Sequence, residues 1–334
     1  MRMDRIGDLI LTLPVDRIAP DADVTWWITA GLGFIANSAR PPRQFKELPR
    51  RIKVSEFLHL LIETRRQKFD AAIVFHAPWW VSFLLWLARI PIRAGVKSQW
   101  HSFLFLNHAV RQKRSRAEAS ELEYNFRLVE KVFDLEEGTL KREPLCLSPA
   151  SDEFVATTLA KHGLQKNEYF VVHPGMGGSA LNWPIEHYTS FIQKLRSKAT
   201  VVITGTASDE PYLAPLRERL AAPHDGEHPI AWLDKRLSGP ELVAVLSAAR
   251  AILAPSTGVV HIAASTGRPT FGIYSPVRVQ HPRRWGPQGL NAKAFLPAVT
   301  NCPGEMNCLG ESCPQYGCMR TLVPETILNE MLRV

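Results

Sequence analysis

The sequence predicts an α/β protein made of two Rossmann-like domains that face a cleft. Two observations support this fold class. Strand and helix patterns alternate along both halves of the chain, and the length of 334 residues suits two domains of about 150 residues each. We place the domains at residues 1–148 and 149–334, because residues 147–151 (Leu-Ser-Pro-Ala-Ser) have the composition of a linker. With 46% hydrophobic and 22% charged residues, the chain is globular rather than disordered, collagen-like or coiled coil.

In the first half, hydrophobic periodicity separates strands from helices. Val54, Phe57, Leu58 and Leu61 recur at helical spacing and predict an amphipathic helix. The uncharged stretch at residues 71–88 approaches the length of a membrane span, but Pro78 lies in its middle, so we interpret it as a strand followed by a helix. The predicted elements are strands at residues 24–29 and 71–75 and helices at 54–68, 80–90 and 118–133.

The second half repeats the alternation more regularly. Its predicted strands are residues 169–173, 201–204, 251–254 and 270–274, and its predicted helices are 184–195, 209–220, 240–249 and 258–266. Repeated units of this kind imply parallel sheets with right-handed crossovers. Ligands of such sheets bind beyond the carboxyl ends of the strands, so functional residues are expected in the loops there.

The charge is concentrated in the first half. The net charge is +8 and the pI about 9.4. Residues 1–150 hold 23 Lys and Arg against 17 Asp and Glu, whereas the remainder holds 17 against 15. No nucleic-acid reader motif accompanies these cations, so we predict no nucleic-acid partner. An anionic glycolipid surface beside the apolar helix at residues 80–87 fits better, and a solvated face is the simpler alternative. The basic groups are Arg40, Arg43, Lys46, Arg50, Arg51, Lys53, Arg65, Arg66, Lys68, Arg111, Lys113, Arg114 and Arg116.

Asp8 is the candidate catalytic residue. It follows Gly7 in the turn Arg-Ile-Gly-Asp, directly before an apolar helix. A carboxylate at the start of the first helix could act as a general base at the mouth of the cleft. It could equally cap the helix, and the residues alone leave both roles open.

A glycine-rich loop follows the predicted strand at residues 169–173. Gly175, Gly177 and Gly178 let backbone amides approach a phosphate closely, and Ser179 adds a donor. The pattern is neither a P-loop nor a GxGxxG motif, so a plain turn remains the alternative.

A third motif lies where a predicted strand ends and a helix begins. Ser256 and Thr257 occupy the capping positions before Gly258, where free helix amides attract anions. His261 lies one turn further on, and helical side chains tilt toward the N-terminus, so its ring can reach the same anion. We favour an anion site here over a purely structural histidine.

Four of the five cysteines, Cys302, Cys308, Cys313 and Cys318, gather near the end of the chain, and Cys146 stands apart. Four thiolates could hold zinc, but the spacing lacks the close CxxC pairs of such sites. We therefore predict free thiols and no metal. The chain opens without a signal-peptide pattern, which favours a reduced, cytoplasmic protein.

These motifs together resemble those of glycosyltransferase family 9, the bacterial lipopolysaccharide heptosyltransferases. The resemblance is carried by Asp4-Arg5-Ile6-Gly7-Asp8 through Pro14, by His173-Pro174-Gly175 through Ser179 with Asn182-Trp183-Pro184, and by Ser256-Thr257-Gly258 with His261. Pro269 and the run Gly-Ile-Tyr-Ser-Pro at residues 272–276 continue the last motif. The motifs occur in the order of the family and cover most of the chain.

The resemblance implies a GT-B fold, with the acceptor on the N-terminal domain and a nucleotide-sugar, ADP-heptose, on the C-terminal domain. The reaction would be inverting and metal-independent, with no cofactor besides the donor substrate. Asp8 matches the general base, and Ser256, Thr257, Gly258 and His261 match the diphosphate pocket. The loop from Gly175 to Ser179 and Asn182 would line the donor site, and Glu210 would reach the ribose. The acceptor would be the anionic lipid A–core of a Gram-negative cell, at the cytoplasmic face of its inner membrane.

The chain departs from the family pattern at three points. Leu181 stands where characterised members often have Lys, and Ser256 where they often have Asp. Another nucleotide-sugar used in envelope polysaccharide synthesis is therefore an alternative donor. Only three residues precede Asp4, so we expect a truncated first strand, and a degenerate, non-catalytic member is the remaining alternative.

Overall fold

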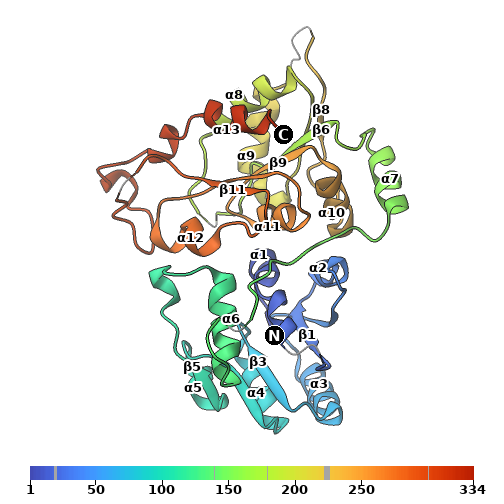
Figure 1. Ribbon diagram of the computed structural model, residues 1–334, viewed down its shortest axis with the longest axis vertical. Coiled ribbons are helices and arrows are strands. Elements are labelled where there is room, and N and C mark those ends of the chain that lie inside the picture. The colour runs from blue at the N-terminus through green and yellow to red at the C-terminus, as the bar shows by residue number, and fades with distance from the viewer. Residues whose placement is uncertain (19–20, 139, 179, 222–225, 300) are drawn as a thin grey trace. The chain divides into compact units, whose positions relative to one another are not determined.

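A computed structural model describes residues 1–18, 21–138, 140–178, 180–221, 226–299 and 301–334 of the protein. The chain divides into two compact units (Figure 1). The N-terminal unit comprises Met1–Arg114 and Glu121–Leu145, and the C-terminal unit comprises Ser115–Ser120 and Cys146–Val334. Across these described ranges, no helix combines the length and the hydropathy needed to cross a membrane.

The N-terminal unit is built on parallel strands. One pair is formed by β1 (Thr25–Thr29) and β2 (Gln44–Leu48). A second set is formed by β3 (Ala71–Val74), β4 (Ile92–Val96) and β5 (His108–Val110), in that order. The strands predicted at residues 24–29 and 71–75 thus appear as β1 and β3, each one residue shorter.

Residues 1–3 connect these two sets of strands. Arg2 forms a parallel bridge to Ile28 on one side and to His76 on the other. The backbone N–H of Arg2 donates to Trp27 O at 3.0 Å, and that of Met3 donates to His76 O at 2.8 Å. Three extended residues therefore lie where we expected an abbreviated first strand, and they end next to Asp4.

Six α-helices accompany these strands in the described residues of the unit: α1 (Ile6–Ile10), α2 (Gly33–Ser38), α3 (Val54–Gln67), α4 (Trp79–Leu87), α5 (Trp100–Phe105) and α6 (Glu121–Val132). The uncharged stretch at residues 71–88 forms β3 and α4, as predicted. Helix α4 ends at Leu87 rather than near residue 90, because Arg89 adopts a left-handed conformation with φ of 60°. The buried face of α4 packs with β3 and α3 in the core of the unit.

The C-terminal unit contains one six-stranded, all-parallel sheet in the order β8-β7-β6-β9-β10-β11. The strands are β6 (Tyr169–Val172), β7 (Thr200–Ile203), β8 (Ile230–Trp232), β9 (Ala251–Pro255), β10 (Thr270–Ile273) and β11 (Ala292–Phe295). The chain runs outward from β6 in one direction and then from β9 in the other. This is the doubly wound order, and its topological switch point lies between β6 and β9.

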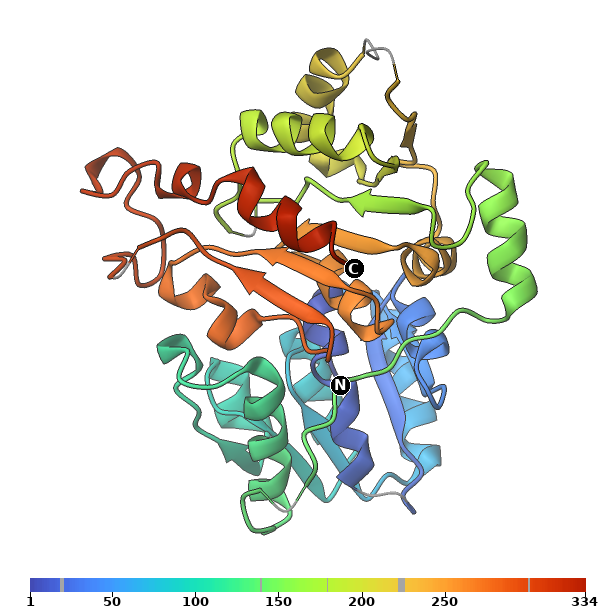
Figure 2. The same ribbon diagram turned by 45° about the horizontal axis from the view of Figure 1, so that its top comes forward.

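Helices cover both faces of this sheet (Figure 2). They are α7 (Asp152–Lys161), α8 (Ile185–Arg196), α9 (Glu210–Arg219), α10 (Gly239–Ala248), α11 (Gly258–Ser265), α12 (Pro282–Trp285) and α13 (Pro324–Met331). The α8 side holds the large buried side chains Trp183, Tyr188 and Phe191, which pack on Phe170 and Val172 of β6. This packing fixes β6 from the side of α8, and it holds the carboxyl end of β6, where the glycine loop begins, in place.

Candidate active site

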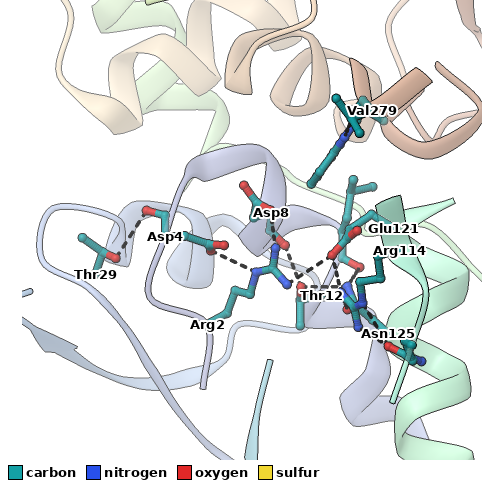
Figure 3. Close-up of polar contacts among 12 residues, drawn as sticks. Arg2, Asp4, Asp8, Thr12, Thr29, Arg114, Glu121, Asn125 and Val279 are labelled. Atoms are coloured by element: carbon teal, nitrogen blue, oxygen red, sulfur yellow. Dashed lines mark hydrogen bonds and ion pairs between the residues drawn. The ribbon is translucent and has the colours of Figure 1, made fainter. Parts of the chain in front are cut away.

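In the N-terminal unit, Asp8 lies in the first turn of α1, two residues after the helix begins. The N-cap position of this helix is occupied by Arg5, so Asp8 is not its N-cap residue. Instead, an oxygen of the Asp8 carboxylate accepts a hydrogen bond from the guanidinium of Arg2 (Figure 3). Thr12 Oγ1 donates to the main-chain oxygen of Asp8 at 2.6 Å and steadies the same turn.

Arg2 is the centre of a buried ionic network. Its guanidinium pairs with three carboxylates: Asp8, Asp4 at 2.9 Å and Glu121 at 3.3 Å. Glu121, on α6, also accepts from Arg114. Burial disfavours the charged guanidinium, but the surrounding carboxylates outweigh it and raise the pKa of Arg2. A buried charge persists when it is paired and hydrogen-bonded, as this one is.

The carboxyl group of Asp4 differs from its neighbours in the network. Burial raises the pKa of Asp4 to about 7, against the lowering effect of Arg2, and the charge of Asp8 adds to the rise. At neutral pH, Asp4 therefore stands near its titration midpoint beside Asp8. Carboxyl groups with perturbed pKa values cluster at functional sites, and Asp4 lies directly after the extended residues 1–3.

In the C-terminal unit, His173 follows β6 at the switch point. Its backbone N–H donates to Leu253 O on β9 at 2.9 Å, and its Nδ1 lies 3.0 Å from Thr204 Oγ1. Burial lowers the pKa of His173 to about 4, and the negative charge of Asp209 opposes this only in part. The imidazole is therefore neutral at physiological pH.

The glycine loop packs tightly on the segment after β7. A Cβ at Gly175 would lie 2.0 Å from Asp209 Cγ, so only glycine fits there. Asp209 is itself fixed, because its Oδ2 accepts from Thr206 N at 2.8 Å and from Thr206 Oγ1 at 2.7 Å. Gly177 and Gly178 adopt left-handed conformations with φ of 56° and 71°, which glycine reaches without strain. Ser179 lies outside the described residues.

Asn182 secures the far end of this loop. Its Nδ2 donates to Pro174 O at 2.8 Å, and its Oδ1 accepts from Trp183 N and Tyr188 Oη, both at 2.8 Å. The side chain therefore ties the start of the loop to its end. Leu181, the neighbouring residue, packs its side chain partly against the hydrophobic core, and its N–H donates to Gln280 Oε1 at 3.2 Å.

The third motif lies beside the glycine loop in the sheet. Val172 of β6 is the register partner of Leu253 of β9, so the loops after these two strands begin next to each other. Ser256 N donates to Ile273 O at 2.9 Å, and Thr257 is the N-cap of α11, whose first residue is Gly258. The side chain of Thr257 forms no capping bond in the described structure, and His261 lies buried in the first turn. Gly175, Gly177 and Gly178 are thus brought to the same sheet edge as Ser256, Thr257, Gly258 and His261.

Glu210 begins α9 on the loop after β7. Its carboxylate forms ion pairs with Lys235 and, at 3.1 Å, with Arg217. These cations lower the pKa of Glu210, the hydrogen bond from Lys235 having the largest effect. The residue predicted to reach a ribose therefore lies at the expected strand end, but it is already engaged by two cations.

The four clustered cysteines line a cavity of about 260 Å³, together with Leu181, Asn182 and Pro184. All five cysteines are free thiols. Burial and the neighbouring thiols raise the pKa of Cys318. Among the described residues, no three His, Cys, Asp or Glu side chains are arranged to hold a metal ion.

Sequence reasoning missed several members of both sites. Nothing in the spacing of Arg2 and Glu121 indicates that a helix more than a hundred residues away meets the first turn. The sequence did contain a signal for Asp209, because an Asp next to a helix start is a capping residue, but the prediction named its neighbour Glu210. His173 belonged to a quoted motif, but only the structure shows that it is neutral and held by Thr204.

Both units are α/β units with parallel strands, and the C-terminal one is doubly wound, with a glycine loop and a helix N-terminus at its switch point. These features define a protein of the nucleotide-binding Rossmann-like class. The family model "Glycosyltransferase family 9 (heptosyltransferase)" matches residues 58–315. The chain belongs to this family and is a glycosyltransferase. Asp8 precedes the matched residues, so its role rests on the structure of the N-terminal unit and on the motif around it.

Similar proteins agree with this assignment. The Haemophilus influenzae protein named "Putative glycosyltransferase" is 32% identical over 244 residues, covering 70% of this chain and 68% of its own length. The structure of the Escherichia coli ADP-heptose lipopolysaccharide heptosyltransferase II superposes with a TM-score of 0.76 at 19% identity, covering 99% of this chain and 96% of that one. An E. coli heptosyltransferase solved with ADP superposes with a TM-score of 0.69 at 17% identity, covering 100% of this chain and 99% of that one. These structures show that the fold is GT-B, as predicted.

Proposed function

We propose that this glycosyltransferase moves heptose from ADP-heptose to the inner core of lipopolysaccharide, with inversion and without a metal ion. The observation that carries the donor half of the proposal is the adjacency of the glycine loop and the start of α11 at the switch point. Both supply backbone N–H groups, and such groups stabilise a diphosphate without side-chain charge. The solved relative named an ADP-heptose heptosyltransferase supports the choice of donor.

Asp8 is the proposed general base. It accepts the proton of an acceptor hydroxyl while that oxygen forms a bond to the anomeric carbon of the donor. The bond from the anomeric carbon to the diphosphate oxygen breaks, and its electron pair leaves with ADP. The amides at Gly258 and in the glycine loop stabilise the negative charge that develops on this leaving group. A single displacement of this kind inverts the anomeric centre.

The acceptor is proposed to be the anionic lipid A–core, met at the cytoplasmic face of the inner membrane. The charge distribution supports this choice, since residues 1–150 carry the larger basic excess and the donor unit is close to neutral. Long-range attraction to a phosphorylated glycolipid raises the encounter rate and weakens with salt.

A direct transfer assay tests the proposal. The protein is incubated with ADP-heptose and a Kdo-bearing acceptor in the presence of a chelator, and the product is examined by mass spectrometry and NMR. We expect a heptosylated product whose anomeric configuration is opposite to that of the donor. Retention of configuration, or no transfer to either a Kdo-bearing or a heptosylated acceptor, would refute the proposal.

A second candidate donor is another nucleotide-sugar of envelope polysaccharide synthesis. Leu181 favours it, because this side chain packs partly against the core where characterised members often place a Lys near the donor phosphate. A thermal-shift screen of ADP-, GDP-, UDP- and TDP-sugars separates the two candidates. A ligand at 100 times its dissociation constant stabilises the protein by about 2.7 kcal/mol, so the cognate nucleotide stands out clearly.

A further inference from the structure

Three neighbouring helices of the N-terminal unit expose large apolar side chains. Helix α4 lies between α3 and α5 and packs against both (Figure 1). Exposed apolar groups lie on each helix, and the largest exposed fractions on α5 are 59% for Trp100 and 66% for Leu104. We call this surface the aromatic face. Its exposed members are Val54, Leu58, Ile62, Trp79, Trp86, Trp100, Phe103 and Leu104.

The aromatic face is continuous across the three helices. Phe83 is its centre, with ring centroids 5.9 Å from Phe57 on α3, 6.0 Å from Trp86 on α4 and 5.3 Å from Phe105 on α5. Trp79 and Trp100 connect α4 and α5 directly, at 6.2 Å. Mutual packing of rings holds these side chains in place without covering them, and an exposed contiguous apolar surface of this kind marks an interaction site.

The helix predicted at residues 80–87 is exposed on one side only. Trp80, Val81, Leu84 and Leu85 are buried in the core of the unit, whereas Trp86 is exposed. The side chains that remain available are those of Trp79 and Trp86, which flank this buried stripe.

Cations border the aromatic face. Residues 53–105 contain seven Lys and Arg against three Asp and Glu, and Glu63 is paired with Lys46. Lys97 Nζ lies 4.9 Å from the ring centroid of Phe103, and Arg65 Nη2 donates to Leu87 O at the end of α4, at 2.9 Å. Positive charge therefore touches the apolar surface itself. The basic residues are Lys53, Arg65, Arg66, Lys68, Arg89, Arg93 and Lys97.

We infer that the aromatic face is a membrane-docking surface whose partner is an anionic phospholipid bilayer. Trp and Phe side chains enter the headgroup boundary, while Lys and Arg at the rim pair with lipid phosphate. The positive charge at the rim favours an anionic bilayer over a second copy of this chain, because two such faces would bring like charges together. The docking surface rests on the proposed function and extends it, since it would hold the enzyme at the membrane where a lipid-linked acceptor lies.

Vesicle binding tests the surface without sugar substrates. The full chain is sedimented with vesicles of phosphatidylcholine alone or with added phosphatidylglycerol, at low and at physiological salt. We expect binding only when the anionic lipid is present, and weaker binding in salt. Lipids brominated along the upper acyl chain should quench part of the tryptophan fluorescence, because Trp79, Trp86 and Trp100 are the exposed tryptophans of this face.

Two variants separate the apolar and the charged contributions. Phe103→Ser with Leu104→Ser removes two exposed side chains of α5 and should weaken binding at least tenfold. Arg65→Gln with Lys97→Gln removes the two cations that contact this face and should weaken binding about fivefold for each charge removed. Leu290→Ser is the matched control, because Leu290 is fully exposed in the C-terminal unit, and it should bind as the unaltered chain does. Unchanged circular dichroism and melting temperature verify that each variant is folded.

The inference fails if the chain binds neutral and anionic vesicles equally, or if Phe103→Ser with Leu104→Ser binds like Leu290→Ser. It also fails if light scattering shows a dimer that the α5 variant abolishes, since the occupant would then be a second copy. If the proposed function is wrong and the docking surface is right, the chain still binds anionic vesicles but transfers no heptose. Conversely, transfer to a soluble acceptor without vesicle binding overturns the docking surface alone.

Discussion

The site around Asp8 and the site around Gly175 handle charge in opposite ways. In the N-terminal unit, a buried guanidinium is surrounded by the carboxylates of Asp4, Asp8 and Glu121. In the C-terminal unit, the groups at the switch point are glycine amides, a helix start and His173, whose pKa burial lowers to about 4. The first site is an ionic network, whereas the second places neutral dipoles beside the carboxylate of Asp209.

The difference fits the task proposed for each unit. A proton acceptor must be an ionisable group held in one orientation, and Arg2 provides that orientation for Asp8. A diphosphate already carries its charge, so preorganised amides suffice to bind it. Arg2, Arg43 and Arg114 form ion pairs within the N-terminal unit, so other Lys and Arg side chains of the first half carry its basic excess.

Replacing Asp8 gives the largest expected effect and tests the division of labour between the two units. Asp8→Ala should lower the transfer rate by about 10²–10⁴, the usual cost of losing a general base. ADP binding, measured by thermal shift, should remain as in the unaltered chain, because the donor site belongs to the other unit. Turnover that survives in Asp8→Ala would remove Asp8 from the role of base, and loss of ADP binding would show that the two sites are not separate.

Removing the central cation tests whether the N-terminal site depends on its charge. Arg2→Met leaves the buried carboxyl group of Asp4 without its counter-charge and leaves Glu121 with Arg114 alone, and we expect a loss of about 3–5 kcal/mol in the free energy of unfolding. Arg17→Met is the matched control, because its pair with Glu143 is exposed and should be worth less than about 1 kcal/mol. Urea denaturation of both variants gives the comparison. Equal losses would mean that the Arg2 network is no more than a surface ion pair.

The two sites also differ in how much of each could be predicted from the sequence. The sequence predicted that the glycine loop and the start of α11 lie at one end of the sheet, because both motifs follow strands and a doubly wound sheet brings the ends of its strands together. The ionic network around Asp8 was not predicted, since Arg2, Glu121 and Arg114 meet only through tertiary packing. Strands with strong apolar runs, such as β6 and β9, were predicted to within one residue. Strand β2 was missed, because its sequence Gln-Phe-Lys-Glu-Leu is polar and exposed at the edge of the sheet.

A glycine substitution tests the close packing on which the neutral site depends. Gly175→Ala places a Cβ against Asp209, so the loop must shift, and we expect a loss of about 1–3 kcal/mol in stability together with weaker ADP binding. In the background of Asp209→Gly, the same change should cost at least 1 kcal/mol less, because this substitution removes the whole Asp209 side chain, including the Cβ that would lie 2.3 Å away. A double-mutant cycle by chemical denaturation and ADP titration measures this coupling. A coupling of zero would mean that Gly175 and Asp209 do not meet.

The smallest expected effect is a pair of pH-dependent contributions to stability that have opposite signs, one from His173 and one from Asp4. The pKa of His173 is lowered to about 4, so the folded C-terminal unit keeps this group neutral while an unfolded chain protonates it near pH 6.5. Its stabilising contribution is present above pH 6.5 and is lost as the pH falls toward 4. The pKa of Asp4 is raised to about 7, so the folded N-terminal unit holds a proton that an unfolded chain releases near pH 4. Its contribution is present at low pH and is lost as the pH rises through 7.

Hydrogen exchange followed by mass spectrometry resolves these responses, because peptides from each unit are measured in the same sample. Between pH 7.5 and 5.5, after correction for intrinsic exchange, we expect peptides of β6 and β9 to lose protection in the unaltered chain and to lose less of it in His173→Gln. Peptides of β1 and β3 also report the Met1 ammonium, whose pKa burial lowers to about 5 and which donates to Ile73 O of β3, so that its contribution opposes that of Asp4. The contribution of Asp4 is therefore the difference from Asp4→Asn, relative to which the unaltered chain should gain protection in β1 and β3. Each contribution should be on the order of 1 kcal/mol. If both units shift in the same direction and neither substitution alters the slope, the contrast between an ionic and a neutral site does not govern their stability.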